Sequence, residues 1–167
     1  GDAVDPSIQK LVMGTAFGIA LSLVVFAGSE LFTGHTMYMP LGWLRGKTNG
    51  LDLGKDWLIV WIGNLFGSAG LAVIFFLGGA GGLVSDSLSF LNNVASAKMN
   101  APVVELFARA ILCNWLVCLA LWMSARTKND AAKCILIFWC LFAFIASGFE
   151  HSVANMTLFS ISLLGTH

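Results

Sequence analysis

Charged residues are scarce in this sequence: they make up 11% of the 167 residues, whereas soluble domains carry about 25%. Hydrophobic residues account for 57%, and the mean hydropathy is +0.83. A chain with so little polar side-chain surface cannot coat a water-soluble globule. The composition therefore excludes a soluble domain and predicts an integral membrane protein.

The sequence also lacks an excess of either charge, because nine Lys and Arg balance nine Asp and Glu. Nucleic-acid binding needs clustered positive charge, so no nucleic-acid partner is expected. The cysteines show no CxxC spacing, and all lie in apolar segments, where we expect small buried hydrophobes: Cys113, Cys118, Cys134 and Cys140. His35 and His151 have no accompanying ligand cluster, so no metal is predicted. With no nucleophile–base pair or cofactor motif, neither an enzyme nor a cofactor is predicted.

What the sequence does contain is four apolar segments, at about 11–44, 57–78, 103–123 and 132–164. At 1.5 Å per residue, a helix of about 20 residues crosses the roughly 30 Å hydrocarbon core of a bilayer. We therefore interpret residues 1–167 as one all-α transmembrane domain surrounded by lipid.

Positive charge is unevenly distributed between these segments. The loops at 45–56 and 124–133 hold six of the nine Lys and Arg residues. The positive-inside rule places these two loops in the cytoplasm. The segment 83–102 and both ends of the chain are then expected on the opposite side.

The first and last apolar segments are interrupted by polar stretches, at 28–35 and 148–156. Ionisable groups at membrane depth are rare and usually functional, and broken helices occur there only inside protein or along a cavity. Two plainer alternatives are a helix that simply ends near Gly28 and a His151 that is only a satisfied core group. The acid and amide beside His151 favour the functional reading.

The two interruptions match each other. Residues 27–30 (AGSE) align with residues 147–150 (SGFE), and the predicted topology gives their segments opposite orientations. Broken helices so related are typical of an inverted repeat with its site at the membrane midplane. A complete inverted repeat needs one more span at each end, so we expect these to be the central four of six spans.

Three stretches, 27–34, 114–120 and 146–156, resemble the signatures of the formate/nitrite transporter family, and the likeness extends over the whole chain. Residues 34–37 and 113–115 are more similar to the nitrite-channel branch. The resemblance implies an aquaporin-like inverted-repeat bundle with two broken helices, assembled as a homopentamer in the bacterial inner membrane. The implied substrate is a small monovalent anion, most simply nitrite, with formate or hydrosulfide as alternatives.

The resemblance also implies individual roles. His151 corresponds to the central pore histidine, Thr33 faces it, and Asn114 completes the polar pocket. Glu150 orients the break, and Lys98 attracts anions, although Lys98 could also be a simple interface anchor. Six apolar residues correspond to constrictions on either side: Phe17, Leu21, Leu31, Phe32, Val117 and Phe144.

The chemistry of these residues suits anion passage. A small anion pays a large desolvation penalty in an apolar constriction. Hydroxyl and amide donors lower that penalty, and an imidazole carries a proton that is mobile near neutral pH. We expect proton-coupled transport, with the anion crossing as such or transiently as its acid. A structural membrane protein without transport is the more distant alternative.

Overall fold

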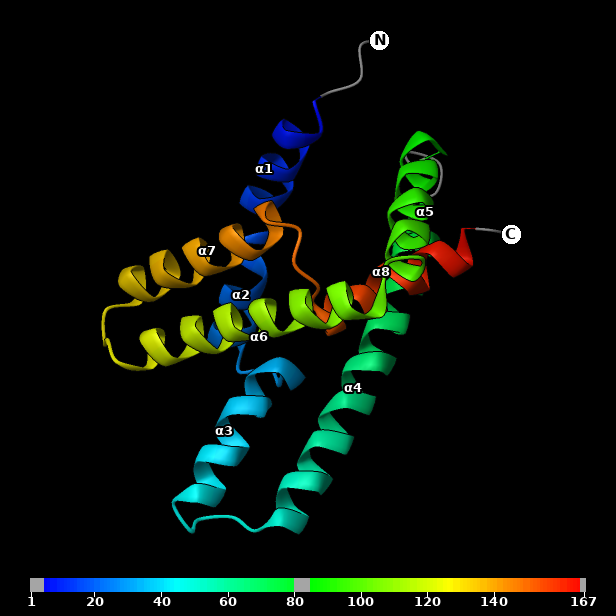
Figure 1. The fold of residues 1–167 in the computed structure, drawn as a ribbon. Coiled ribbons are helices and arrows are strands. Elements are labelled where there is room, and N and C mark those ends of the chain that lie inside the picture. The colour runs from blue at the N-terminus through cyan, green and yellow to red at the C-terminus, as the bar shows by residue number, and fades with distance from the viewer. Residues whose placement is uncertain (1–4, 80–84, 166–167) are drawn as a thin grey trace.

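The computed structural model describes residues 5–79 and 85–165, and within these ranges every regular element is a helix. The predicted all-α membrane fold with two broken helices is confirmed (Figure 1). The helices are α1 (Pro6–Phe17), α2 (Ile19–Ala27), α3 (Phe32–Leu44), α4 (Gly50–Leu77), α5 (Ser85–Met99), α6 (Val103–Ala125), α7 (Asp130–Ala146) and α8 (Ser152–Leu164).

Side-chain caps fix where several helices begin. The Asp5 carboxylate accepts a hydrogen bond from the backbone N–H of Ser7 at 2.7 Å, and this bond starts α1. Asn49 forms a capping box with Asp52 at the start of α4. Asn129 caps α7 by accepting from the N–H of Ala132 at 3.0 Å. The turns before α4 and α7 thus end in a residue that satisfies an otherwise unpaired helix donor.

Three described stretches are long and apolar enough to cross a membrane: Ser7–Ala27, Gly50–Leu77 and Val103–Ala125. α4 begins before the apolar segment predicted at 57–78 because the capping box continues the helix through its polar first turns. The last predicted segment, 132–164, is divided into helices of 17 and 13 residues. The predicted external segment 83–102 contains α5, and its residues 83–84 lie outside the described ranges.

α1 and α2 form one nearly continuous helix that crosses α7 at close range. Gly18, at their junction, keeps helical angles and donates its N–H to the carbonyl of Gly14 at 3.2 Å. A Cβ added at Gly18 would lie 2.3 Å from Cδ2 of Phe138. The absence of a side chain therefore allows the two backbones to approach each other.

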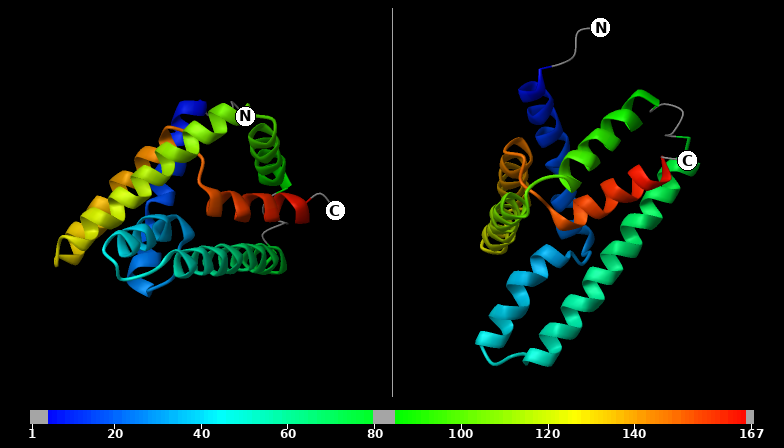
Figure 2. Two further views of the ribbon diagram at one scale, coloured as in Figure 1. Left: turned by 60° about the horizontal axis from the view of Figure 1, so that its bottom comes forward. Right: turned by 45° about the vertical axis from the view of Figure 1, so that its right-hand side comes forward.

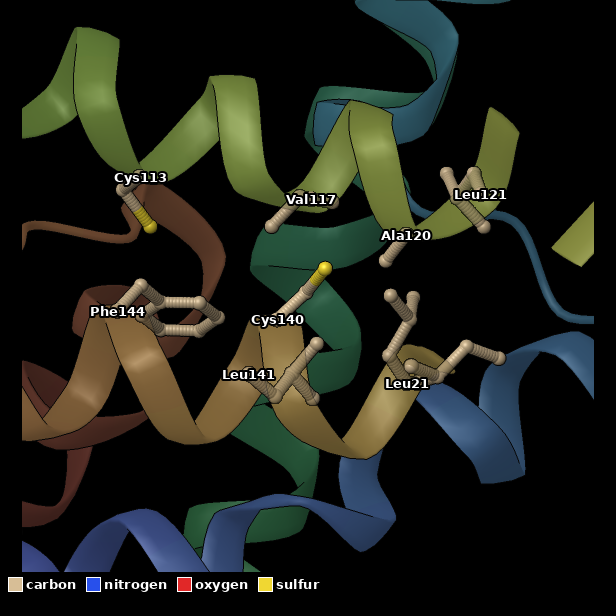
Figure 3. Packing of buried hydrophobic residues seen from close by; sticks show 9 residues of the cluster. Leu21, Cys113, Val117, Ala120, Leu121, Cys140, Leu141 and Phe144 are labelled. Atoms are coloured by element: carbon tan, nitrogen blue, oxygen red, sulfur yellow. The ribbon is translucent and has the colours of Figure 1, made fainter. Parts of the chain in front are cut away.

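The other helices pack as neighbouring pairs. α6 and α7 form a hairpin, as do α3 and α4, and α8 runs between α4 and α5 (Figures 1 and 2). A buried apolar cluster between α2, α6 and α7 forms the core (Figure 3): Leu21, Cys113, Val117, Ala120, Leu121, Ile137, Cys140, Leu141 and Phe144.

The cysteine prediction is only partly right. Cys113 and Cys140 are buried in this cluster, Cys118 is half-buried, and Cys134 is exposed on α7. Cys134 lies one turn from the start of α7, on the side turned away from the cluster, so an apolar neighbourhood in sequence did not mean burial.

Large apolar side chains remain exposed on the outer faces of α4 and α6. Ile59 and Phe66 of α4 are exposed, as are Val104, Phe107 and Trp115 of α6. Exposed apolar area costs about 25 cal/mol per Å² in water, whereas contact with lipid or another apolar helix removes that cost. These faces suit a membrane protein.

Candidate functional site at the two helix breaks

The two breaks have the same backbone course. Gly28 after α2 has φ 71°, and Gly148 after α7 has φ 70°, a left-handed conformation that glycine adopts without strain. The next residue in each case donates its N–H five residues back, from Ser29 to the carbonyl of Val24 at 3.0 Å and from Phe149 to that of Phe144 at 2.9 Å. The sequence alignment of the two stretches therefore corresponds to a structural repeat.

Leu31 and His151 occupy equivalent positions, three residues after the glycine. Both have extended angles (φ −118° and −107°), and each precedes the first residue of a new helix, α3 or α8. The backbone turns out of one helix, runs extended past the third residue and enters the next helix. The side chain at this position therefore lies between two helix ends.

His151 is buried and makes two hydrogen bonds through its ring. Nδ1 accepts from the N–H of Ala154 at 3.1 Å and so caps α8. Because a backbone N–H can only donate, Nδ1 carries a lone pair and the neutral ring holds its proton on Nε2. Nε2 lies 3.3 Å from Oγ1 of Thr33, to which it donates. The ring also stacks on Phe144, with centroids 5.7 Å apart.

Asn114 reaches the same region through Thr36, a residue that the sequence analysis missed. The Asn114 amide donates to Oγ1 of Thr36 at 2.9 Å, and that hydroxyl donates to the carbonyl of Thr33 at 2.7 Å. Oδ1 of Asn114 is buried and has no partner among the described residues. Thr36 follows Thr33 by three residues on α3, and this helical spacing was the available signal.

Glu150 points away from the imidazole, toward α5. Its side chain is 9% exposed, and Oε2 accepts from Nζ of Lys98 at 2.5 Å and from Nδ2 of Asn155 at 2.9 Å. The structure thus pairs the two charged residues that the sequence analysis gave separate roles. Asn155, which lies in the predicted motif, was missed as a partner of Glu150.

His151 borders three cavities. Five of the six predicted constriction residues line the first with His151, a cavity of about 530 Å³: Phe17, Leu21, Leu31, Val117 and Phe144. The rings of Phe17 and Phe144 meet edge-on with centroids 5.9 Å apart.

Phe32, the sixth of these residues, lines a second cavity of about 610 Å³ with Thr33, Asn114 and His151. Its ring packs edge-on against Trp57 of α4, with centroids 6.3 Å apart. Lys98 lines a third cavity of about 370 Å³. The structure therefore brings His151 together with five of the apolar residues in one cavity and with Thr33 and Phe32 in another, while Lys98 lines a third.

The first break is held by α4. Asn64 accepts the N–H of Phe32 on Oδ1 at 2.9 Å and donates from Nδ2 to the carbonyl of Glu30 at 2.9 Å. One side chain thereby satisfies a donor and an acceptor that the break leaves without helical partners. Asn64 was also missed, since it lies within an otherwise apolar predicted span.

Comparison with known proteins defines the class. A solved structure titled as an FNT family ion channel matches with a TM-score of 0.91 and 51% identity, covering 98% of this chain and 65% of that chain. A pentameric formate channel with formate bound matches with a TM-score of 0.82 and 29% identity, covering 96% and 63%. The fold is that of a helical membrane channel.

The family follows from sequence comparison. The formate/nitrite transporter model matches residues 1–167, and the chain belongs to this family. The nitrite transporter NirC of Escherichia coli K12 is 53% identical over 170 residues, covering 100% of this chain and 62% of the relative. A probable formate transporter of Methanothermobacter thermautotrophicus is 38% identical over 172 residues, covering 93% and 62%.

The chain thus spans about three-fifths of the length of these relatives. These relatives and structural neighbours are named as transporters and channels.

Proposed function

We propose that the protein conducts small monovalent anions across the bacterial inner membrane, with nitrite as the first candidate. The observation that carries this proposal is the buried His151, which bonds to Thr33 and lines one cavity with five apolar residues. The name of the relatives with 53% identity supports nitrite.

The proposal extends to how the protein assembles and how it is oriented in the membrane. The pentameric relative supports a homopentamer in lipid, with one pore in each protomer. The basic loops at 45–56 and 124–133 face the cytoplasm by the positive-inside rule.

The site offers hydrogen bonds suited to an anion. His151 donates from Nε2 to the Thr33 hydroxyl oxygen, and among the described residues that hydroxyl has no other partner. Its own hydrogen is therefore free to donate to an anion oxygen in the adjoining cavity. Charged hydrogen bonds contribute about 1.5–3 kcal/mol, which offsets part of the desolvation cost.

The unpaired Oδ1 of Asn114 offers the complementary group, an acceptor. An anion cannot use it, but the O–H of nitrous or formic acid can donate to it once the Asn114 side chain turns this buried oxygen toward the cavity that it lines. The second cavity therefore presents a donor at Thr33 and an acceptor at Asn114, which suits both protonation states of a small weak acid.

Proton transfer from His151 to the anion requires a second proton on the ring. In the observed arrangement Nε2 holds the only proton, and losing it would leave an imidazolate. Protonation of Nδ1 supplies the second proton and breaks the bond from the N–H of Ala154. Proton coupling at His151 is thus tied to the cap of α8.

The test is His151→Phe in the full-length protein reconstituted in proteoliposomes. We expect proton-coupled nitrite flux to be abolished, and unchanged flux would overturn the proposal. His151→Gln is the matched variant, because its longer amide reaches the place of Nε2 and can still donate to Thr33 but cannot take a second proton. It should retain anion flux and lose its coupling to protons.

Formate is the second candidate substrate, favoured by the structural match to a formate-bound channel. Uptake of nitrite, formate and hydrosulfide by the same vesicles separates the candidates. A formate rate well above the nitrite rate would reassign the substrate and leave the site unchanged.

A further inference from the structure

His35 lies between two carboxylates outside the site described above. Its Nδ1 is 2.7 Å from Oδ2 of Asp56 on α4, and its Nε2 contacts Oε2 of Glu30 in the first break. The His35 side chain is 15% exposed, that of Asp56 25% and that of Glu30 70%. The carboxylates face opposite ring nitrogens, so the three groups cannot chelate one metal ion.

The hydrogen bonds define the protonation of this ring. An ionised carboxylate can only accept hydrogen bonds, and a neutral imidazole has a single N–H. Two simultaneous bonds therefore need a proton on each nitrogen. In this form the three groups together carry one net negative charge, and loss of a proton raises that to two.

The repeat gives this cluster a counterpart at the other break. His35 follows Glu30 by five residues, as Asn155 follows Glu150, and both contact the preceding glutamate. At the second break the glutamate is paired with the ammonium group of Lys98. At the first break the only cation in the cluster is an imidazole, whose charge varies near neutral pH.

The position of the cluster connects it to the pore. Glu30 and His35 line a cavity of about 230 Å³ together with Leu21 and Leu31, which also line the main apolar cavity. α3 leads from there to the basic loop at 45–56, which is predicted to be cytoplasmic. An ion that moves between the cytoplasmic end of the proposed pore, at this loop, and His151 therefore passes the cluster.

The groups around His35 leave Glu30 and Asp56 as its charged neighbours. On α3 the Tyr38 ring lies 6.5 Å away, and on α4 Trp57 donates to the His35 carbonyl at 3.2 Å. α6 contributes the thiol of Cys118 beyond Thr36. Residues 152–164 of α8 include no ionisable side chain.

We infer that the Glu30–His35–Asp56 cluster is a second protonation centre, which sets the negative charge at the cytoplasmic mouth and thereby the rate of anion entry. The inference rests on the proposed function. A protonated His35 lowers repulsion of the anion, so entry from this side rises as the pH on this side falls. One extra unit charge several ångströms from the path, in contact with water, corresponds to about a two- to fivefold change in rate.

The first measurement is independent of transport. In 15N-histidine spectra of the full-length protein, the signal lost in His35→Gln identifies His35. We expect two protonated nitrogens near pH 7, and a larger neutral fraction in Asp56→Asn. A His35 that is neutral near pH 7, or spectra that do not change in Asp56→Asn, would overturn the inference.

The second measurement is nitrite entry into proteoliposomes against the pH on the cytoplasmic side. The wild type should show the two- to fivefold step, and His35→Gln should lose it. Glu105→Gln, which removes an exposed partner of Arg109 on α6, is the matched charge control and should keep it. An unchanged profile in His35→Gln would overturn the role in entry.

The two measurements also separate the two proposals. A wild type that carries none of the tested anions at any pH would overturn the proposed function and the role in entry. The spectra would then decide alone whether the cluster is a protonation centre.

Discussion

Glu30 and Glu150 occupy the same place in two backbones of the same shape, yet the side chain of Glu30 is 70% exposed and that of Glu150 only 9%. The residue that follows each of them also differs. Leu31 lines apolar cavities, whereas His151 lies buried against Thr33 and caps the next helix. The two breaks thus share a backbone conformation, but their side chains differ in burial and in the contacts that they make.

This difference gives the proposed pore a direction. The second break places one hydrogen-bonding ring at the centre and pairs its acid with Lys98. The first break places an apolar side chain at the equivalent position and leaves its acid largely exposed and paired with His35. Substitutions that make the two breaks alike, or that measure how they differ, test this comparison.

The largest effect is expected when the second break is made like the first. His151→Leu removes the donor to Thr33 and the cap of α8. Without this donor, Thr33 loses the partner that directs its hydroxyl hydrogen toward the anion, and loss of that charge-assisted hydrogen bond, worth about 1.5–3 kcal/mol, corresponds to a tenfold to hundredfold fall in nitrite flux. Stopped-flow vesicle uptake measures it, with Val104→Ala on the exposed face of α6 as the control. Flux near the wild-type rate would show that the breaks are functionally equivalent.

The next effect is on stability at the second break. Glu150→Gln leaves Lys98 without its ion-pair partner in a largely buried setting, and the expected cost is about 3 kcal/mol. Thermal unfolding in detergent measures this cost. The double variant with Lys98→Met should recover most of it, because no unpaired charge remains. Equal losses in the single and double variants would contradict this assignment.

Alanine at the glycine of each break should have a smaller and equal effect. Gly28→Ala and Gly148→Ala each force a side chain into left-handed angles, at about 1–2 kcal/mol. An added Cβ meets nothing within 4 Å at Gly28 and only Nζ of Lys10, at 3.9 Å, at Gly148. Gly63→Ala in α4 is the control, because a Cβ there meets nothing and the angles are helical. Clearly unequal losses of unfolding free energy at the two breaks would contradict their structural equivalence.

The smallest effect is expected at Glu30. Glu30→Gln changes an ion pair whose acid is 70% exposed, so unfolding should shift by less than about 1 kcal/mol. The same melting experiment compares it with Glu150→Gln. A loss as large as that of Glu150→Gln would show that the two acids have equivalent structural roles.

The sequence was informative where the physics is local. Glycine before an acid in an apolar segment predicted both breaks, and the scarcity of charge predicted the membrane. The resemblance suggested that Thr33 faces His151, and the structure places them in contact.

Contacts between distant segments were harder to predict. Neither the pairing of Glu150 with Lys98, 52 residues apart, nor that of Asn114 with Thr36, 78 residues apart, follows from any periodicity in the chain. Phe32 turns toward Trp57 because α4 packs on that side of α3. These contacts depend on which helices pack against each other, and the hydropathy pattern of the sequence does not predict helix packing.

Asn64 has a mechanical consequence. With one amide it holds both the carbonyl before Leu31 and the N–H after it, as a neighbouring strand would hold an edge. Any shift of the backbone at Leu31 must therefore move α4 along with the first break, or break both hydrogen bonds together. At the second break the backbone N–H of Glu150 donates to the carbonyl of Arg109 on α6 at 3.5 Å, and the Glu150 and His151 side chains bond to Lys98 on α5 and Thr33 on α3. The first break is thus held to a neighbouring helix through its backbone, whereas the second is held mainly through its side chains.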